Sequence, residues 1–592
     1  MNKVNRLFDL LDLYRTEYAS LDVAFAGRYG GEWITYSAND FVNITERLSA
    51  GLLRHGVGKG AKVATIINNC PEWNFIDMAI LQIGAIHVPV YPTISADSFT
   101  YIFNHADIEY IFIFDKATFI RIEESVRQTK TIRELFSVQP VEGLKHWSQL
   151  IEPEVSQSTR ERIKAISNTI NSSDLATIIY TSGTTGIGKG VMLSHSNLIS
   201  NFIATSEILA PKKVKVALSF LPLCHVYERM LNYLYQYLGI SVYYADSLEN
   251  LGNTIREVKP EMLCAVPRML EKIFDKIQAG GRALRQPRRG IFIWAWRLAN
   301  RYQLYGAKGR NYELRLKIAD FLVYSKWRQA LGGKLRYIVS GGASLRPRIA
   351  KVLWAANIQV IEGYGLTETS PVVAVGTFEP DGIKFGTVGK PLKGVQVKIA
   401  PDGEILCKGP NIMMGYYKDE AMTREVIDNE GWFHTGDIGT LIEGKFLKIT
   451  DRKKEMLKTS GGKYIAPQEI ENRFRESPFI ENIIVVGDNR NFAAALIVPD
   501  FEYVKSWCAI KGIEPIDNCL LVKDQRIIER FNREVNEINK HLGKTEQVKK
   551  FLLLPQEWST ITGELSLTLK IRRSFTMEKY KKEIERLYGK KR

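Results

Sequence analysis

Cysteine is scarce in this chain of 592 residues, and long hydrophobic runs are absent. The six cysteines lie far apart and no two have CxxC spacing, which argues against a disulfide framework or a zinc ribbon and favours a reducing compartment. No apolar stretch approaches the roughly 18 residues that a transmembrane helix needs. The first 20 residues contain carboxylates and lack a small-residue cleavage site, so we expect no secretory signal. These absences predict a cytoplasmic protein.

The length and composition are typical of a globular protein with several domains. At roughly 150 residues per domain, the chain corresponds to about three or four structural units. Hydrophobic residues make up 45% and charged residues 25% of the chain, which is not the balance of a disordered or fibrous protein. There is no long internal repeat and no low-complexity tract.

The net charge of +16 is concentrated in one segment. Residues 281–337 contain 14 Lys and Arg against only Glu313 and Asp320, a net of +12, and Trp and Tyr are interleaved with them. Solvated helix faces would explain this composition. So would an anionic membrane surface, at which aromatic rings lie at the headgroup level. No recognised nucleic-acid-binding motif accompanies the charge, so we expect no nucleic-acid partner.

Short apolar strands alternate with helical patterns along the first part of the chain. Runs such as Lys62–Ile67 and Tyr110–Phe114 are apolar on both faces, which indicates parallel strands covered by helices on both sides. Short strands with Gly and Pro turns predict a β-rich subdomain over 377–450. Farther on, Ile483–Gly487 and Ala494–Val498 predict an antiparallel pair next to long helices.

We therefore predict an α/β fold in two parts. The large N-terminal domain, 1–450, consists of parallel-sheet α/β subdomains and the β-rich subdomain. A hinge at 451–454 joins it to a small, mobile α+β C-terminal domain, 455–592.

A strand at Ala176–Tyr180 runs directly into Thr181–Gly190, a segment made mostly of Gly, Ser and Thr with one lysine, Lys189. Glycines let backbone N–H groups approach an anion, and hydroxyls and the lysine add donors and charge. The segment matches the first seven positions of a P-loop. The eighth must be Ser or Thr to hold Mg²⁺ and is Gly190 here, so the segment is a phosphate loop of another kind.

This segment resembles the signature YTSGTTGxPKG of the AMP-forming acyl and aryl adenylating enzymes, with Gly188 in place of the usual proline. Adenylating a carboxylate requires a pocket for adenine and ribose, Mg²⁺ on the phosphates, and charge stabilisation where pyrophosphate leaves. Tyr364 offers an aromatic face for a purine, and Thr367 a hydroxyl for a phosphate. Glu368 offers an oxygen ligand for Mg²⁺, and Asp437 a carboxylate for the ribose hydroxyls.

Four later segments resemble the matching motifs of that superfamily: 340–343, 362–369, 431–437 and 451–471. The resemblance extends from about residue 5 to the end of the chain, and 431–439 with 446–471 resemble the fatty acyl-CoA synthetases in particular.

The resemblance implies a set of site residues. Those implied to cradle the phosphates are Thr181, Ser182, Gly183, Thr184, Thr185, Gly186 and Lys189. Those implied to frame adenine are Gly342, Ala343, Glu362, Gly363 and Tyr364. Thr367 is implied to meet the α-phosphate, and Glu368 and Thr184 are assigned both catalytic and Mg²⁺-binding roles. Asp437 and Arg452 are implied to hold ribose, Lys454 to lie at the hinge, and Gly461, Gly462 and Lys463 to lie on the coenzyme A side.

In this family a lysine near the C-terminus reaches the substrate carboxylate and the α-phosphate during adenylation. The segment Thr562–Arg573 resembles the long-chain branch, in which this lysine follows Thr-Gly by a few residues, behind Thr-Pro-Thr. The proline of that motif is absent here. We predict Lys570 to be the catalytic lysine; the alternative places it on a basic surface strand with Arg572 and Arg573.

His225 lies in Pro222–Arg229, where the family places the helix that lines the acyl pocket. It is either a wall of the pocket near the acyl carboxylate, which is its catalytic assignment, or a satisfied core histidine. The residues around it are largely apolar or aromatic, and the segment has no aspartate to bind the ammonium group of an amino acid. A fatty acid substrate is therefore expected.

We predict an ATP-dependent long-chain fatty acid–CoA ligase that uses ATP, Mg²⁺ and coenzyme A. It would form acyl-AMP and pyrophosphate, and then acyl-CoA and AMP. Because fatty acids partition into membranes, peripheral contact of 281–337 with the inner face of a membrane becomes a plausible part of this function.

Three other functions stay open. A fatty acyl-AMP ligase would stop at the adenylate, but the insertion usual in that relative is absent between Asp437 and Glu471. A luciferase-like oxygenase would use the same fold, and no sequence feature tests it. A non-catalytic nucleotide- and lipid-binding protein at a membrane surface is disfavoured by five intact residues: Lys189, Glu368, Asp437, Arg452 and Lys570. The sequence predicts neither oligomeric state nor preferred acyl length.

Overall fold

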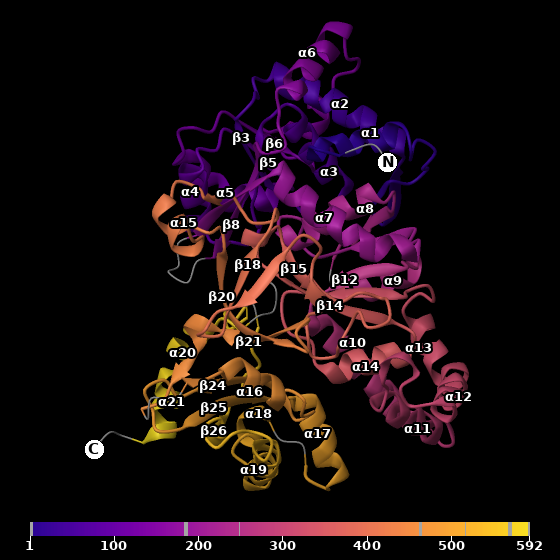
Figure 1. The fold of residues 1–592 in the computed structure, drawn as a ribbon, viewed down its shortest axis with the longest axis vertical. Coiled ribbons are helices and arrows are strands. Elements are labelled where there is room, and N and C mark those ends of the chain that lie inside the picture. Colours follow the sequence, from indigo (N-terminus) through magenta and orange to yellow (C-terminus); the bar gives the residue numbers. More distant parts are fainter. Residues whose placement is uncertain are drawn as a thin grey trace.

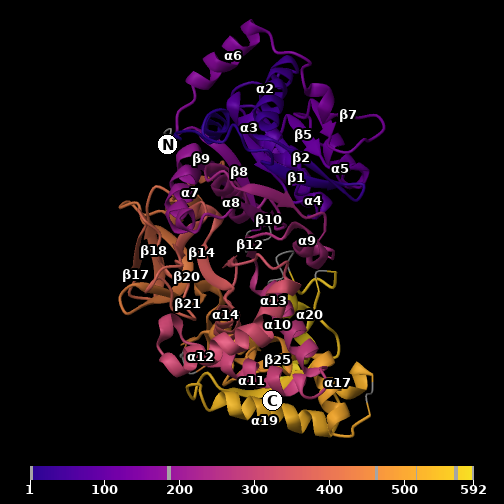
Figure 2. The same ribbon diagram turned by 90° about the vertical axis from the view of Figure 1, so that its right-hand side faces the viewer.

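Two large α/β sheets, an antiparallel sheet and a C-terminal α+β unit make up the structure (Figure 1). It is a computed structural model that describes residues 4–182, 188–247, 249–460, 464–514, 517–559, 561–565 and 571–589. The N-terminal sheet lies at the top of Figure 1 and the C-terminal unit at the bottom, and the perpendicular view in Figure 2 agrees.

The first sheet has eight strands. In spatial order they are β19 (Gly415–Tyr416), β9 (Gly188–Ser194), β8 (Leu175–Ser182), β4 (Ile86–Pro89), β3 (Lys62–Ile66), β5 (Tyr110–Ile113), β6 (Glu134–Ser137) and β7 (Lys145–His146). Strands β8 to β7 run parallel, whereas β8–β9 and β9–β19 are antiparallel pairs.

Helices cover both faces of this sheet, as the two-sided apolar strands predict. One face packs against α2 (Ala38–Arg54) and α3 (Pro71–Gln82), and the other against α4 (Ala96–His105) and α5 (Lys116–Arg127). Helix α2 begins with a capping box, in which Ser37 and Asp40 each accept a hydrogen bond from the other's backbone N–H. Helix α6 (Gln157–Asn168) extends this region.

The second sheet has nine strands. Their order is β16 (Lys390–Pro391), β15 (Val372–Val375), β14 (Gln359–Gly365), β13 (Tyr337–Ser340), β12 (Met262–Ala265), β10 (Val216–Ser219), β11 (Ser241–Tyr244), β1 (Phe25–Tyr29) and β2 (Glu32–Tyr36). Strands β14 to β1 run parallel, and the three outer pairings are antiparallel. The helices of this region are α1 (Leu10–Arg15), α7 (His195–Leu209), α8 (Val226–Tyr237), α9 (Leu251–Val258), α10 (Pro267–Arg282) and α14 (Pro347–Ala355).

The predicted β-rich region forms a four-stranded antiparallel sheet. Its order is β17 (Gln396–Ile399), β18 (Glu404–Lys408), β20 (Phe433–Ile442) and β21 (Phe446–Arg452), and α15 (Glu420–Val426) lies in the connection before β20. Asp437 lies inside β20, where it pairs in register with Arg452 on β21.

A separate hydrophobic core begins after β21. Its buried residues run from Leu457 to Leu587. The core includes the three-stranded sheet β24 (Ile480–Val486), β25 (Ala493–Pro499) and β26 (Val548–Leu553), of which the first two strands form the predicted antiparallel pair. The remaining elements are β22 (Leu457–Lys458), β23 (Tyr464–Ile465), α16 (Pro467–Phe474), α17 (Phe501–Ile510), α18 (Asn518–Leu521), α19 (Gln525–Asn539), α20 (Arg573–Lys579) and α21 (Lys581–Tyr588). The predicted α/β class is confirmed, whereas the hinge at 451–454 and its mobility stay predictions.

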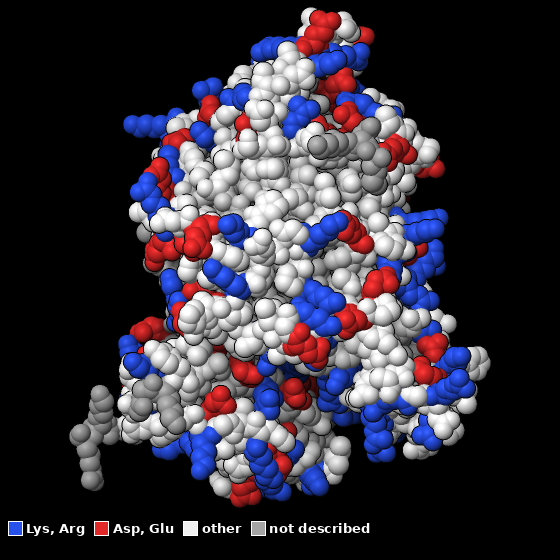
Figure 3. Space-filling model, viewed as in Figure 1, with Lys and Arg blue, Asp and Glu red and all other residues white. Residues whose placement is uncertain are grey.

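The basic segment forms a helical projection from the second sheet. It consists of α11 (Arg288–Asn300), α12 (Arg310–Ala319), a π-helical turn (Asp320–Tyr324) and α13 (Ser325–Ala330). Lys and Arg side chains gather over these helices at the lower right of Figure 3. Trp296, Tyr324 and Trp327 are buried against one another, so these aromatic residues form a core rather than an exposed belt.

All six cysteines are free, five of them buried and Cys519 exposed, as expected for a chain without disulfides. Among the described residues, no helix is both long and apolar enough to cross a membrane.

Candidate active site

The carboxyl ends of the parallel strands in the two α/β sheets face each other. Asn69, which follows β3, donates a hydrogen bond of 2.6 Å to the carbonyl oxygen of Leu221, which follows β10. Its side-chain oxygen accepts one of 3.1 Å from the N–H of Leu223. Ligands of α/β proteins bind outside the carboxyl ends of parallel strands. Predicted site residues lie at these ends: Thr181 on β8, His225 after β10, Gly342 and Ala343 after β13, and Gly363 and Tyr364 on β14.

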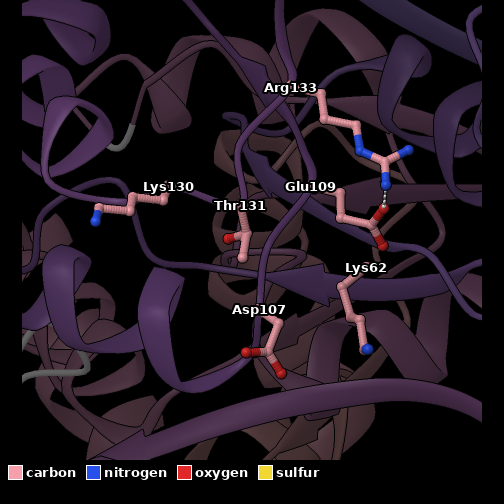
Figure 4. Close-up of a pocket in the computed structure, with 6 residues that line it drawn as sticks. All are labelled: Lys62, Asp107, Glu109, Lys130, Thr131 and Arg133. Carbon is pink, nitrogen blue, oxygen red and sulfur yellow. Dashed lines mark ion pairs between the residues drawn. The ribbon is translucent and has the colours of Figure 1, made fainter.

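A hollow of about 330 Å³ lies at the opposite edge of the first sheet (Figure 4). Its lining precedes β3, β5 and β6 or begins them: Lys62, Asp107, Glu109, Lys130, Thr131 and Arg133. Both carboxylates there are already paired, since Arg133 contacts Glu109 at 3.1 Å and Lys418 contacts Asp107 at 2.8 Å. This hollow is therefore not the candidate site.

Tyr364, Asp437 and Arg452 come together from three strands. The Tyr364 hydroxyl donates a hydrogen bond of 2.6 Å to a carboxylate oxygen of Asp437, and Arg452 Nε lies 3.6 Å from the other oxygen. Burial, reinforced by the Asp437 charge, raises the pKa of Tyr364 well above its usual value, so the hydroxyl stays a donor. The N–H of Asp437 donates to Thr435 Oγ1 at 3.1 Å, which fixes the backbone beside the carboxylate.

Lys189 and Glu368 are linked by a residue that the sequence did not indicate, Tyr416. The Tyr416 hydroxyl donates to Glu368 Oε1 at 2.9 Å, and Lys189 Nζ lies over the Tyr416 ring, 5.1 Å from its centre. Strand β19 positions Tyr416 by pairing it with Val191 on β9. Lys189 lies at the start of β9, in register with Thr181 on β8. The one available signal was an aromatic pair after Gly415, which has no motif attached to it.

The elements on either side of the phosphate segment distinguish this site from a P-loop. Strand β8 is followed by an antiparallel strand, and α7 begins only at His195, after β9. In a P-loop the phosphate segment leads directly into a helix. The sequence-based rejection of a P-loop is therefore consistent with the observed chain path.

Glu362 is a half-buried carboxyl group beside the predicted adenine segment. It accepts a hydrogen bond of 3.0 Å from the N–H of Leu345, and burial raises its pKa to about 8. Gly342, with a φ of +84°, and Ala343 are exposed on the loop after β13. Gly365 ends β14 where a Cβ atom would lie 1.8 Å from the carbonyl oxygen of Pro371, so no side chain fits there. Thr367 is buried in the short 3₁₀ turn that also carries Glu368.

His225 caps α8 instead of lying in the core. Its ring nitrogen Nδ1 accepts a hydrogen bond of 3.3 Å from the N–H of Tyr227, and the side chain is half-buried beside Tyr91. The apolar residues that follow, including Met230 and Leu234, are buried in the main core.

One helical turn farther along α8, Arg229 lies fully buried. It donates to Asp77 at 2.7 Å and to Thr177 on β8 at 2.7 Å. Asp77 also accepts a hydrogen bond of 2.6 Å from Tyr233. Burial alone would raise the pKa of Asp77, but Arg229 and the hydrogen bond with His87 outweigh it and lower the pKa. The network ties α8, which begins beside His225, to the strand that enters the phosphate segment.

Eight predicted site residues lie outside the described part of the chain: Gly183, Thr184, Thr185, Gly186, Gly461, Gly462, Lys463 and Lys570. The side chain of Ser182 also lies outside it. Lys454 is described and lies exposed in the 3₁₀ turn Lys453–Glu455, immediately after β21. Near Lys570, Leu565 and Ile571 pair in an antiparallel bridge.

Comparison with known proteins identifies two matching family models. The model described as "AMP-binding enzyme" matches residues 17–417, and the model "AMP-binding enzyme C-terminal domain" matches residues 454–592. A long-chain-fatty-acid–CoA ligase of Mycobacterium bovis, FadD15, is 34% identical over 95% of this chain and 93% of its own.

Two further comparisons agree with this relationship. The peroxisomal long chain acyl-CoA synthetase 6 of Arabidopsis thaliana is 32% identical over 97% of this chain and 84% of its own. Among solved structures, the adenylation domain of a carboxylate reductase from Mycobacterium chelonae superimposes with a TM-score of 0.75. It has 20% identity and covers 99% of this chain and 92% of its own, which supports the shared fold.

Proposed function

This chain belongs to the AMP-binding enzyme family, and from that membership we propose that it is an ATP-dependent, AMP-forming ligase that joins long-chain fatty acids to coenzyme A. The relatives that cover nearly all of the chain bear the names of long-chain-fatty-acid–CoA ligases, which supports the substrate class.

One structural observation carries the proposal. The residues expected to serve one reaction are far apart in the sequence but form two contacting groups. In one, Tyr416 contacts both Lys189 and Glu368; in the other, Asp437 contacts both Tyr364 and Arg452. Both groups include residues at the carboxyl end of β14, because Glu368 follows that strand and Tyr364 lies within it. Such an edge can hold a nucleotide with its base and ribose on one side and its phosphates on the other.

We assign the residue roles as follows. Tyr364, with Gly342, Ala343, Glu362 and Gly363, would frame adenine, while Asp437 and Arg452 would hold the ribose hydroxyls. Thr181 to Gly186 and Lys189 would cradle the phosphates, and Thr367 would meet the α-phosphate. Gly461, Gly462 and Lys463 would face coenzyme A, and Lys454 would serve as the hinge residue.

Glu368 and Thr184 would hold Mg²⁺. The described part of the chain contains no group of three or more His, Cys, Asp and Glu side chains that could form an all-protein metal cage. Mg²⁺ is commonly held by one or two carboxylates together with substrate phosphates, so a single carboxylate fits this ion. When bound, Mg²⁺ supplies charge neutralisation on the phosphates. The hydrogen bond from the Tyr416 hydroxyl restricts the orientation of the Glu368 carboxylate that would hold the ion.

The proposed reaction has two steps. A carboxylate oxygen of the fatty acid attacks the α-phosphorus of ATP, and pyrophosphate leaves as the acyl-adenylate forms. The thiol sulfur of coenzyme A then attacks the acyl carbonyl, loses its proton, and displaces AMP. Lys570 would stabilise the first step, and His225 would line the pocket near the acyl carboxylate.

The same lysine separates the two steps experimentally. Lys570→Ala should abolish adenylation but retain thioester formation from supplied acyl-adenylate, because movement of the C-terminal domain about Lys454 would carry the lysine away between steps. Lys549→Ala, an exposed lysine on β26, is the matched control and should behave like the native chain. Equal loss of both half-reactions in the Lys570 variant would refute the two-state assignment.

A fatty acid with about fourteen methylenes gains on the order of 10 kcal/mol from burial at most, before ordering costs, and it partitions into bilayers for the same reason. We therefore include peripheral contact of the basic segment 281–337 with a membrane in the proposed function.

Product analysis tests the proposal directly. Incubation with ATP, Mg²⁺, coenzyme A and palmitate should yield palmitoyl-CoA and AMP in equal amounts, measured by mass spectrometry. Formation of ADP and phosphate would refute AMP-forming chemistry, and accumulation of acyl-AMP without thioester would favour a fatty acyl-AMP ligase. A chain that binds ATP and fatty acid without turnover would be a non-catalytic binding protein.

A further inference from the structure

The helical projection carries a row of exposed apolar side chains on one face. Leu314, Ile318, Phe321 and Leu322 are 61%, 47%, 80% and 37% exposed. Leu314 and Ile318 are four residues apart on α12, and Phe321 and Leu322 follow about one turn later in the π-helical turn. The opposite face supplies Leu316, Ala319 and Val323 to the core of the projection, so burial within this chain does not explain the exposed row.

Positive charge borders this row. Arg310, Lys317 and Lys326 are exposed and lie four residues from Leu314, Phe321 and Leu322 respectively, which is one helical turn. Of the 14 Lys and Arg in 281–337, twelve are exposed. The acidic residue nearest to Phe321 is neutralised, because Asp320 forms a bidentate pair with Arg328, one arm of it 2.9 Å long.

The projection forms the lower right edge of the molecule in Figure 1 and faces the viewer in Figure 2, so a flat surface can approach it. We propose that the face made by Leu314, Ile318, Phe321 and Leu322, with Arg310, Lys317 and Lys326, docks on an anionic lipid bilayer. The four apolar side chains enter the boundary between headgroups and acyl chains, and the three cations remain among the lipid phosphates.

Two observations favour a bilayer over an acidic protein. The apolar side chains stand on the outer side of a projecting helix, as in helices that lie in the plane of a membrane interface. The cations are distributed along the whole length of the row, so any anionic headgroup beneath it is matched. Of the aromatic residues that first indicated a membrane, Trp296, Tyr324 and Trp327 are buried and play no part.

This inference specifies the membrane contact within the proposed function, and its test separates the two. The full-length chain is sedimented with vesicles of phosphatidylcholine alone or mixed with phosphatidylglycerol. It should bind the anionic vesicles strongly and the neutral ones weakly, since each cation near an anionic surface strengthens binding roughly fivefold. The double variant Ile318→Ser/Phe321→Ser should lower the partition coefficient by tenfold or more.

Matched variants guard against general effects. Ile510 is 81% exposed on α17 of the C-terminal unit, and Ile510→Ser should bind like the native chain. Lys317→Glu should weaken binding to anionic vesicles, whereas Lys164→Glu, on the distant helix α6, should not. Equal binding by the double variant and the native chain, or equal binding to neutral and anionic vesicles, would overturn the proposal.

Turnover supplies an independent readout. With palmitate embedded in anionic vesicles the double variant should be slower than the native chain, and with palmitate delivered on albumin the two should be equal. If the proposed ligase activity is wrong, both formats give no thioester while the sedimentation result still stands. A double variant that is slowed equally in both formats would overturn the docking role.

Discussion

Replacing Arg229 with methionine should be among the most destabilising single changes in the N-terminal region. The guanidinium is fully buried and donates to Asp77, to Thr177 at 2.7 Å and to Tyr233 at 2.9 Å. Methionine fills much of the same volume and supplies none of these donors. Asp77 would then lose its guanidinium partner and keep the hydrogen bonds with His87 and Tyr233, while burial, the largest influence on the pKa of His87, opposes protonation of that ring.

The magnitude follows from the desolvated charge. Removing one partner of a buried ion pair costs about 3–5 kcal/mol. Asp77→Asn alone should also be costly, because it leaves Arg229 unpaired. The double variant Arg229→Met/Asp77→Asn removes both charges, so its loss of stability should be smaller than the sum of the two single losses by roughly 1–3 kcal/mol.

Urea unfolding followed by tryptophan fluorescence measures these differences, because Trp73 lies against the guanidinium of Arg229. The centre of the Trp73 ring is 5.4 Å from Arg229 Cζ. Arg229→Lys is the matched control. It keeps the charge but loses the planar fork that reaches three acceptors, so its cost should be intermediate. A loss below about 1 kcal/mol for Arg229→Met, or strict additivity in the double variant, would refute the argument that this network is tightly coupled.

Three further outcomes are expected. Burial raises the pKa of Glu228 to about 8, so the stability it contributes is fully present below its unfolded pKa and is lost as pH rises through 8. The free energy of unfolding of Glu228→Gln, measured in urea, should therefore rise relative to that of the native chain by about 1.4 kcal/mol per pH unit between pH 5 and 8. Parallel curves of unfolding free energy against pH for the two proteins would contradict this. Tyr416→Phe should raise the Mg²⁺ concentration for half-maximal turnover several-fold by releasing Glu368, and a lowered melting temperature with unchanged Mg²⁺ dependence would show a merely structural role. Tyr364→Phe removes a hydrogen bond to the buried Asp437 and should cost about 1.5–3 kcal/mol of stability in the N-terminal domain, whereas an unchanged unfolding midpoint would disprove the bond.

The sequence predicted the parallel sheets well because hydrophobic runs on buried strands are a local signal. Lys62–Ile66 and Tyr110–Ile113 are apolar on both faces, a pattern visible in the segments themselves, and the structure places them in the centre of the first sheet. The hydrogen bond between Tyr364 and Asp437 could not be predicted from the sequence. Their residue types were recognised, but the contact joins β14 to β20 across 73 positions of the sequence, and local patterns do not encode such a contact.

Two functional features were missed for physical reasons. Tyr416 lies in a two-residue strand whose importance comes only from its neighbours on β9 and at Glu368. In the sequence Arg229 is an ordinary charged residue of a predicted helix. A single arginine does not indicate that its partner, Asp77, is buried in the core and lies 152 positions earlier in the chain. The basic segment shows the converse error: composition cannot tell which side of a helix faces solvent, and its tryptophans packed inward while Phe321 remained outside.

The most direct test of the central claim is pyrophosphate release with ATP, Mg²⁺ and a series of acids from acetate to oleate, with and without coenzyme A. Thioester is measured in the same samples. A long-chain fatty acid–CoA ligase should release pyrophosphate in sustained turnover only with long-chain acids and coenzyme A, with one thioester formed per pyrophosphate. Absence of pyrophosphate with every acid, or a preference for acetate over oleate, would contradict the account.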